Sequence, residues 1–314
     1  MKNKIKVAVI GAGYMAKEHI KAFSDIPGVE LAGIYSRTID KAQLLAKEFN
    51  IPKVSGTIDE LYDDTEADLV IVSVSILSTA EACYNAFKHP WQCLIEKPAG
   101  YNVTEAELIA VDAREYNRKA FVALNRRHYS STRSAIHELD SVQGCRLVNI
   151  YDQEDLIAAK GANHPEAVLR NWMNANSIHV IDYLNIFCRG EVLAVDQIIK
   201  WNSKDPKFVA AKVTFSSGDI AIYQAVWNGP GPWSVVVTTQ EKRCELKPLE
   251  EAFVQYNGSR IQNPLELAEW DKNFKPGLRR QAEEAIKAIR GEDHNLPTLE
   301  DALKTMKLVE DIYG

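Results

Sequence analysis

A glycine-rich segment near the N-terminus has the spacing of a phosphate-binding loop. Gly11-Ala12-Gly13-Tyr14-Met15-Ala16 follows an apolar run and precedes a helical pattern, the setting in which G-x-G-x-x-G/A binds a dinucleotide. Gly11 permits a tight turn, Gly13 lets the backbone approach a pyrophosphate, and Ala16 allows close packing of helix on strand. Unpaired N–H groups at the start of the helix would meet the anion. The alternative is a glycine-rich turn that binds nothing.

The residues after the second predicted strand bear on the choice of dinucleotide. An NAD enzyme usually carries Asp or Glu about 20 residues beyond the glycines, for the ribose hydroxyls. This chain has Tyr35-Ser36-Arg37-Thr38 instead. A guanidinium offers a charged, bidentate fork to a 2′-phosphate, so the sequence favours NADP, with NAD as the second choice. In the alternative interpretation, Arg37 stacks on the adenine or is solvated.

Two further residues, a lysine and a histidine, have side chains that can hydrogen-bond or exchange a proton. Lys97, within Glu96-Lys97-Pro98, directly follows an apolar strand, at the sheet edge where ligands of open α/β folds collect. From its position alone, it is equally described as a solvated loop lysine. His179 lies in a helical pattern, and an imidazole with an ordinary pKa of about 6.5 can exchange a proton near neutral pH. Its apolar neighbours also fit a histidine that borders a core.

The elements that position these residues fall into two patterns. Up to residue 124, buried-type strands alternate with helices, which predicts an α/β, doubly wound parallel sheet of the Rossmann type. The predicted strands are Ile5–Ile10, Glu30–Tyr35, Leu69–Val74, Gln92–Ile95 and Ala120–Leu124. The predicted helices are Ala16–Phe23, Ile39–Phe49, Thr79–His89 and Thr104–Asn117, the last with Thr104 as its cap.

The second half of the chain predicts an α+β domain over residues 125–314. A helix at about 176–188 precedes strand-like segments separated by turn signals, which indicates a large, mostly antiparallel open sheet. These segments are roughly 192–201, 207–216, 219–227, 233–240 and 243–247. Two helices at about 277–290 and 299–312 close the chain, the second capped by Thr298 with Asp301 three residues on. The predicted domains are therefore 1–124 and 125–314.

Composition excludes several classes of protein. The chain has 314 residues, 46% apolar and 25% charged, enough for the cores of two domains. A net charge of −6 and the lack of a basic run argue against nucleic acid as a partner. No apolar stretch reaches the length of a membrane span or resembles a signal peptide. The five scattered cysteines have no metal-site spacing and predict reduced thiols in the cytoplasm.

In combination, these motifs resemble the Gfo/Idh/MocA family of oxidoreductases. The resemblance rests on Gly11-x-Gly13-x-x-Ala16, Glu96-Lys97-Pro98 and the helix with His179-Val180-Ile181-Asp182. It implies hydride transfer between nicotinamide C4 and a carbinol or carbonyl carbon of a sugar, sugar derivative, nucleotide-linked sugar or cyclitol. It also implies that Lys97 hydrogen-bonds the reacting oxygen and that His179 is the general acid/base. The loop with Ser75 and the residues Glu96 and Asn125 are then expected to adjoin the cofactor. The resemblance further implies a homodimer or homotetramer.

The chain departs from the family pattern in the loop Ser75-Ile76-Leu77-Ser78-Thr79, where many members have a Pro and a His, and at a position before the histidine. Family members commonly carry an aspartate four residues before the histidine, where this chain has Ala175. Asn176 can hydrogen-bond a substrate but cannot titrate, and Asp182 can orient the imidazole only if its side chain turns that way. Ala175 therefore keeps open a second hypothesis, a non-catalytic dinucleotide sensor, whereas the presence of Lys97 and His179 favours catalysis.

Further side chains are candidates for contact with the substrate. Arg126 and Arg127 follow the last strand of the first domain and would suit an anionic sugar; salt bridges at the domain boundary are the alternative. Arg170, Trp172 and Tyr183 flank or lie on the histidine helix and would offer an apolar platform and a polar handle.

Overall fold

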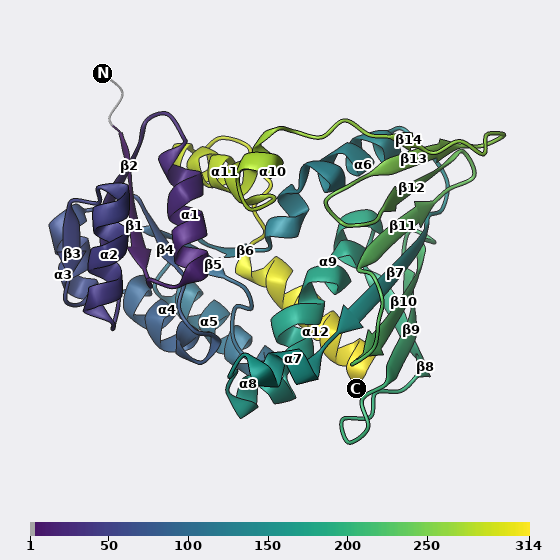
Figure 1. The fold of residues 1–314 in the computed structure, drawn as a ribbon, viewed down its shortest axis with the longest axis horizontal. Helices are drawn as coiled ribbons and strands as arrows, with labels where there is room; N and C mark the ends of the chain where they lie inside the picture. The colour runs from purple at the N-terminus through teal and green to yellow at the C-terminus, as the bar shows by residue number, and fades with distance from the viewer. Residues whose placement is uncertain (1–3) are drawn as a thin grey trace. The chain divides into compact units, whose positions relative to one another are not determined.

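The computed structural model describes residues 4–314, which divide into two compact units. A six-stranded parallel sheet forms the centre of the first unit (Figure 1). Its order, β3-β2-β1-β4-β5-β6, is that of a doubly wound sheet, and it confirms the predicted fold class. The strands are β1 Ile5–Ile10, β2 Val29–Tyr35, β3 Lys53–Ser55, β4 Leu69–Val72, β5 Gln92–Glu96 and β6 Ala120–Ala123.

Helices pack on both faces of this sheet, which explains why its central strands are apolar throughout. All four residues of β4 are buried. Helices α1, α2 and α11 share one core cluster with β1, while α3, α4 and α5 contact one another in series. The helices of this unit are α1 Tyr14–Ser24, α2 Ile39–Phe49, α3 Ile58–Thr65, α4 Thr79–Phe87, α5 Val103–Glu115, α10 Trp270–Asn273 and α11 Leu278–Arg290.

One of the two predicted helix caps is wrong and the other is confirmed. Helix α5 is capped by Asn102, whose side chain accepts a hydrogen bond of 2.8 Å from the backbone N–H of Glu105, so the predicted cap Thr104 lies inside the helix. Helix α12, Leu299–Tyr313, begins after Thr298, whose hydroxyl accepts a bond of 3.1 Å from the N–H of Asp301. Asn and Thr side chains can both cap a helix N-terminus, so the sequence alone did not distinguish Asn102 from Thr104.

An eight-stranded sheet forms the second unit, in the order β14-β13-β12-β11-β7-β10-β9-β8. Of its neighbouring pairs, β7 with β10 is parallel and the others are antiparallel, which confirms the predicted mostly antiparallel sheet. The strands are β7 Leu147–Glu154, β8 Val192–Ile199, β9 Phe208–Phe215, β10 Ile220–Trp227, β11 Ser234–Thr238, β12 Lys242–Leu246, β13 Phe253–Tyr256 and β14 Asn263–Pro264. The sequence analysis had not identified β7, β13 or β14.

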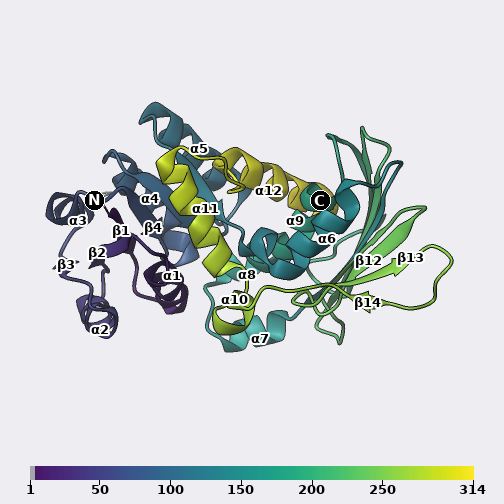
Figure 2. The same cartoon turned by 90° about the horizontal axis from the view of Figure 1, so that it is seen from above.

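The helices of the second unit lie against one face of its sheet, as Figures 1 and 2 both show for α6 and α9. Strands β9 and β10 accordingly alternate between buried and more exposed residues. No helix among residues 4–314 is long and apolar enough to cross a membrane. The helices are α6 Ser130–Asp140, α7 Leu156–Gly161, α8 Glu166–Arg170, a π-helical turn at Met173–Ser177, α9 Ile178–Phe187 and the second half of α12.

The observed division of the chain differs from the predicted domains in one segment. The first unit runs to Asn125 and also contains Trp270–Leu303, while the second contains Arg126–Glu269 and Lys304–Gly314. The first boundary lies next to the predicted one. The returning segment belongs to the first unit because Ala282, Ala285 and Ile286 of α11 join the core formed by β1 and α1. Helical periodicity shows that a face is apolar, but it does not specify which core buries it.

Candidate functional site

The glycine-rich loop has the geometry expected of a phosphate cradle. Gly11 has φ +115°, and a Cβ at that position would lie 1.9 Å from the backbone oxygen of Ser73, so only glycine fits. A Cβ on Gly13 would instead meet no atom within 4 Å, since this residue faces open space. Helix α1 starts at Tyr14 with no acidic residue in its first turn, which leaves its N-terminus favourable to an anion. Ala16 is fully buried and packs in the core.

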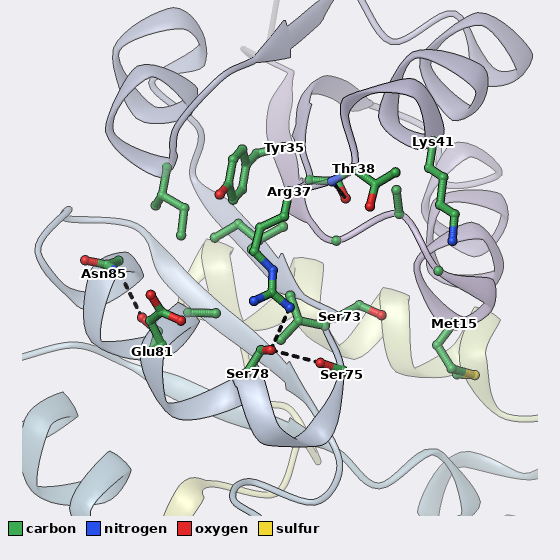
Figure 3. A pocket seen from close by; sticks show the side chains of 18 of the residues that line it. Met15, Tyr35, Arg37, Thr38, Lys41, Ser73, Ser75, Ser78, Glu81 and Asn85 are labelled. Carbon is green, nitrogen blue, oxygen red and sulfur yellow. Dashed lines mark hydrogen bonds between the residues drawn. The ribbon is translucent and has the colours of Figure 1, made fainter. Parts of the chain in front are cut away.

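A cavity of about 540 Å³ opens at this loop and is called here the loop cavity (Figure 3). It is bordered by the carboxyl ends of β1, β2 and β4, because the ends of parallel strands meet at one edge of the sheet. Seven of the residues proposed from sequence to bind the cofactor line it, namely Gly11, Gly13, Tyr14, Met15, Ser36, Arg37 and Ser75. The sequence analysis missed Thr38, Lys41, Ser78, Glu81 and Asn85, which also line it.

A hydrogen-bonded chain crosses one wall of the loop cavity. The guanidinium of Arg37 donates to the hydroxyl of Ser78 at 2.8 Å, and this hydroxyl lies 2.9 Å from that of Ser75 (Figure 3). Lys41, on the first turn of α2, lines the same cavity. Its spacing of four residues from Arg37 was a signal available in the sequence. Two cations beside a glycine cradle match an anionic, phosphate-bearing ligand, so the residues of the loop cavity fit a dinucleotide.

Besides the buried Ala16, three predicted cofactor residues lie outside the described lining of the loop cavity, namely Glu96, Lys97 and Asn125. Glu96 ends β5, and its carboxylate lies 2.7 Å from Nε2 of His19, a buried residue of α1 that the sequence analysis had missed. Lys97 follows at the carboxyl edge of the sheet, half-buried, with a cis peptide bond to Pro98. The side-chain amide of Asn125 donates to the backbone oxygen of Pro276 at 3.0 Å.

His179 belongs to the second unit, whereas Lys97 belongs to the first. His179 is the second residue of α9 and is 8% exposed, so it borders the core but is not completely enclosed by it. Its ring centroid lies 6.4 Å from that of Trp233. The guanidinium of Arg126 lies over the same indole, 4.4 Å from the ring centroid. Trp233 thus has an imidazole and a cation beside it.

A second cavity, of about 410 Å³, lies within the second unit and is called here the indole cavity. Of the residues predicted to contact substrate, Trp172 and Asn176 line it. Its other side chains larger than alanine are Gln153, Asp155, His164 and Trp233. Trp233 directly follows the turn-rich segment 228–232, and the sequence analysis did not identify it as a site residue. Two indoles with amide and carboxylate groups around one hollow are typical of a site for a polar ring compound.

Three of the other predicted substrate contacts are engaged elsewhere. Arg127 forms a bidentate pair with Asp182, at 2.7 and 2.6 Å, which matches the salt-bridge alternative and leaves Arg126 as the remaining candidate for an anion. The Asp182 carboxylate also accepts a bond from Thr305. Tyr183 is fully buried with its hydroxyl 3.0 Å from that of Thr132, and Arg170 is exposed and paired with Glu166. None of the three lines the indole cavity as described.

A buried acid lies close to the position where the helix carries Ala175. Strand β7 ends at Glu154, which is fully buried and accepts hydrogen bonds from Trp172, Asn176 and Ser177. Burial raises the pKa of this carboxyl well above its usual value, the charge of Asp152 raises it further, and the three hydrogen bonds oppose the shift. No pattern in the sequence had marked the strand that carries it.

Comparison with known proteins identifies relatives of the first unit. Residues 5–124 match the family described as "Oxidoreductase family, NAD-binding Rossmann fold" (GFO/IDH/MocA). A glucose-6-phosphate 3-dehydrogenase of Bacillus subtilis (strain 168) is 31% identical over 125 residues, which are 40% of this chain and 35% of that protein. The chain thus matches about a third of the length of this relative.

Two solved structures share the fold over nearly the whole chain. The UDP-N-acetylglucosamine 3-dehydrogenase GnnA of Acidithiobacillus ferrooxidans aligns with a TM-score of 0.80 and 16% identity, over 98% of this chain and 96% of that one. The aldose-aldose oxidoreductase of Caulobacter crescentus, complexed with glycerol, aligns with a TM-score of 0.83 and 18% identity, over 99% and 96%. At such identities the likeness establishes the fold of both units.

Proposed function

We propose that this chain is an NAD(P)-dependent oxidoreductase of sugars, because its residues 5–124 match the Gfo/Idh/MocA oxidoreductase family. It transfers a hydride between nicotinamide and a carbinol or carbonyl carbon of a sugar, a sugar derivative or a nucleotide-linked sugar. The observation that carries the proposal is the loop cavity, in which the glycine cradle, Arg37 and Ser75 come together. The names of the relatives, which are dehydrogenases and an oxidoreductase, favour catalysis over a non-catalytic sensor.

The preferred cofactor in this proposal is NADP. Its pyrophosphate would lie against the N-terminus of α1, and its 2′-phosphate beside Ser36, Arg37 and Lys41. Arg37 is already oriented by its bond to Ser78, which reduces the entropy lost when the phosphate binds. When bound, the nicotinamide supplies or accepts the hydride.

The proton and the developing charge are assigned to the chain's own residues. During oxidation of an alcohol, His179 accepts the hydroxyl proton while the C–H hydrogen leaves as hydride, and a carbonyl forms. The ammonium group of Lys97 hydrogen-bonds the reacting oxygen and stabilises its negative charge as it develops. In the reverse direction, His179 returns the proton. Trp172, Asn176 and Trp233 are the proposed contacts to the sugar, with Arg126 available to a negatively charged substituent.

The test combines cofactor binding with turnover. NADPH and NADH are titrated by fluorescence into the wild type and the variants Lys97→Ala and His179→Ala, and nicotinamide absorbance is followed with a panel of sugars, sugar phosphates and nucleotide-linked ketosugars. We expect kcat to fall by about 10²–10⁴ in both variants while cofactor binding persists. Lys119→Ala and His137→Ala, both at exposed positions, are the matched controls. Tight cofactor binding without turnover on any compound would favour the sensor instead.

A homodimer or homotetramer is part of the proposal. The outward face of the eight-stranded sheet carries Leu147, Phe208 and Ile220, which are 43%, 55% and 38% exposed. Exposed apolar side chains on a sheet face are stabilised when a second copy covers them.

We also propose a cytoplasmic location. Its support is the sequence's five scattered cysteines, because thiols without a pairing framework suit a reducing compartment.

A further inference from the structure

The buried Glu154 is bonded to three side chains of one short segment. Its Oε2 accepts hydrogen bonds from Nε1 of Trp172 at 2.7 Å and from Nδ2 of Asn176 at 2.8 Å. Its Oε1 accepts a bond of 2.9 Å from the hydroxyl of Ser177. The segment includes the π-helical turn Met173–Ser177 and leads directly into the helix of His179. A π-helical turn is uncommon and is frequently found at functional sites. Here one carboxyl group accepts bonds from two side chains of the turn and from Trp172, which precedes it.

Two of these three donors form the wall of the indole cavity. Trp172 and Asn176 line the cavity, and both donate hydrogen bonds to Glu154, which is not among the lining residues. On the other indole, Nε1 of Trp233 donates to the backbone oxygen of Gln153 at 2.8 Å. The last two residues of β7 therefore fix the orientation of both indoles that line the cavity. The Trp172 ring also lies 5.1 Å from that of His164, centroid to centroid, so its plane is held on a second side.

From these contacts we propose that Glu154 is a positioning residue for the sugar: its carboxyl group holds Trp172 and Asn176 in the wall of the indole cavity. This inference rests on the proposed function, because it assigns the cavity to the substrate of that reaction. A sugar ring presents a flat apolar face and directed hydroxyls, so its binding depends on the plane of an indole and the direction of an amide. Small displacements of such groups reduce the rate of the reaction as well as affinity.

The carboxyl group serves as a hydrogen-bond acceptor in this arrangement. The three side chains that donate hydrogen bonds to it are neutral, and Asp152 lies two residues away on the same face of β7. Around this pair, the Tyr223 hydroxyl donates to Asp152 at 2.6 Å and lies 2.9 Å from that of Tyr313. Tyr313 in turn lies 3.3 Å from the hydroxyl of Ser177. Since no cation is among these contacts, the bonding pattern does not require a negative charge at Glu154.

An amide of the same shape satisfies the same pattern, which makes Glu154→Gln the decisive variant. Its carbonyl oxygen can accept from Trp172 and Asn176, while its NH₂ donates to the Ser177 hydroxyl. Ser177 can then donate to Tyr313. Glu154→Leu keeps a similar volume but removes all three bonds, and it leaves the half-buried donors of Trp172 and Asn176 without their acceptor. Tyr223→Phe is the matched control, because it removes a buried hydroxyl of the same network and leaves the three bonds of Glu154 intact.

The experiment uses two readouts on the full chain. In protein labelled with 5-fluorotryptophan, the ¹⁹F resonance of Trp172 is assigned with Trp172→Phe and compared among the variants. With the sugar found in the substrate panel, kcat, KM and the NADPH dissociation constant are measured. We expect Glu154→Leu to shift the Trp172 resonance, to raise KM about tenfold and to lower kcat/KM about 100-fold. Glu154→Gln and Tyr223→Phe remain within about threefold of wild type, and NADPH binding is unchanged throughout.

Each contrary result has a distinct meaning. A Glu154→Leu variant with wild-type kcat/KM or an unmoved Trp172 resonance overturns the proposal. A Glu154→Gln variant as impaired as Glu154→Leu also overturns it, because the proton or the charge would then be required. If Glu154→Leu does not fold, Asn176→Leu and Trp172→Phe remove the bonds from their other ends, and unchanged kcat/KM in both is equally contrary. A wild type that turns over no sugar contradicts the proposed function, and the Trp172 resonance alone then decides whether Glu154 positions this wall.

Discussion

The side chain of Arg37 offers the sharpest test of cofactor choice at the scale of single residues. Arg37→Ala removes a guanidinium that lines the loop cavity, as the ammonium group of Lys41 also does. We expect the dissociation constant of NADPH to rise about tenfold or more while that of NADH changes little, because the lost charge would face only the 2′-phosphate. Fluorescence titration of both cofactors measures this, with Arg114→Ala on the exposed side of α5 as control.

The alternative interpretation of Arg37 makes a different prediction. A guanidinium that stacks on the adenine contacts a part that NADH and NADPH share. Equal weakening of both cofactors in Arg37→Ala would therefore contradict the assignment of this residue to the 2′-phosphate. Lys41→Ala extends the test, since a second cation at the phosphate would also act on NADPH alone.

The buried carboxyl of Glu154 predicts a pH dependence of stability. Burial raises its pKa well above the ordinary value, so over a range of pH the folded protein retains a proton that the unfolded chain has lost. Its stabilising effect is present below the ordinary pKa of about 4.3 and is lost as the pH rises toward the folded pKa. Glu154→Gln cannot titrate. We therefore expect the free energy of unfolding of Glu154→Gln to increase relative to that of the wild type as the pH rises from 5 to 8.

Urea unfolding at several pH values measures this difference. The slope can reach about 1.4 kcal/mol per pH unit for one proton. Asp152 contributes to the pH dependence of both proteins, because burial raises its pKa as well. Hydrogen bonds from Tyr223 and Ser177 oppose that shift. A difference between variant and wild type that is independent of pH would show that Glu154 is ionised in the folded protein.

At the scale of elements, helix α5 depends on a cap that lies two residues before the predicted one. Asn102→Ala removes the acceptor for the N–H of Glu105, whereas Thr104→Ala changes a residue inside the first turn. We expect about 1 kcal/mol of destabilisation from the first and little from the second. Chemical denaturation of both variants tests the assignment. Equal losses would mean that the hydroxyl of Thr104 shares the capping.

At the scale of the whole molecule, the outward face of the eight-stranded sheet predicts self-association. Ile222 lies on this face in the middle of β10, where its neighbours in β10 are buried on the opposite side. We expect the wild type to sediment as a dimer or tetramer and Ile222→Glu to shift it toward monomer, because a charge would be buried at the contact. Leu44→Glu on α2, which is 68% exposed in the first unit, is the control. A monomeric wild type in analytical ultracentrifugation would contradict this prediction.

The sequence by itself determined the parallel first sheet, except for its short edge strand β3, and the glycine-rich loop. The spacing of Gly11, Gly13 and Ala16 predicts the loop from local sequence alone. A tight turn, a close approach of the backbone to a ligand and close packing of helix on strand each require a small residue. The apolar runs of β1 and β4 likewise needed no tertiary information, because a strand buried on both faces is apolar throughout. Chain order then implied the parallel sheet.

Only the tertiary structure decided which distant side chains meet. Trp233, His164 and Trp172 come together around the indole cavity from separate elements, and Glu154 reaches the His179 segment from a strand that sequence patterns did not reveal. Arg127 and Tyr183, chosen as substrate contacts, instead satisfy partners inside the unit. Helix α11 packs with a core formed some 250 residues earlier. The physical reason is common to all four: periodicity reports that a side chain is buried or exposed, whereas its partner is fixed by the packing of elements remote in sequence.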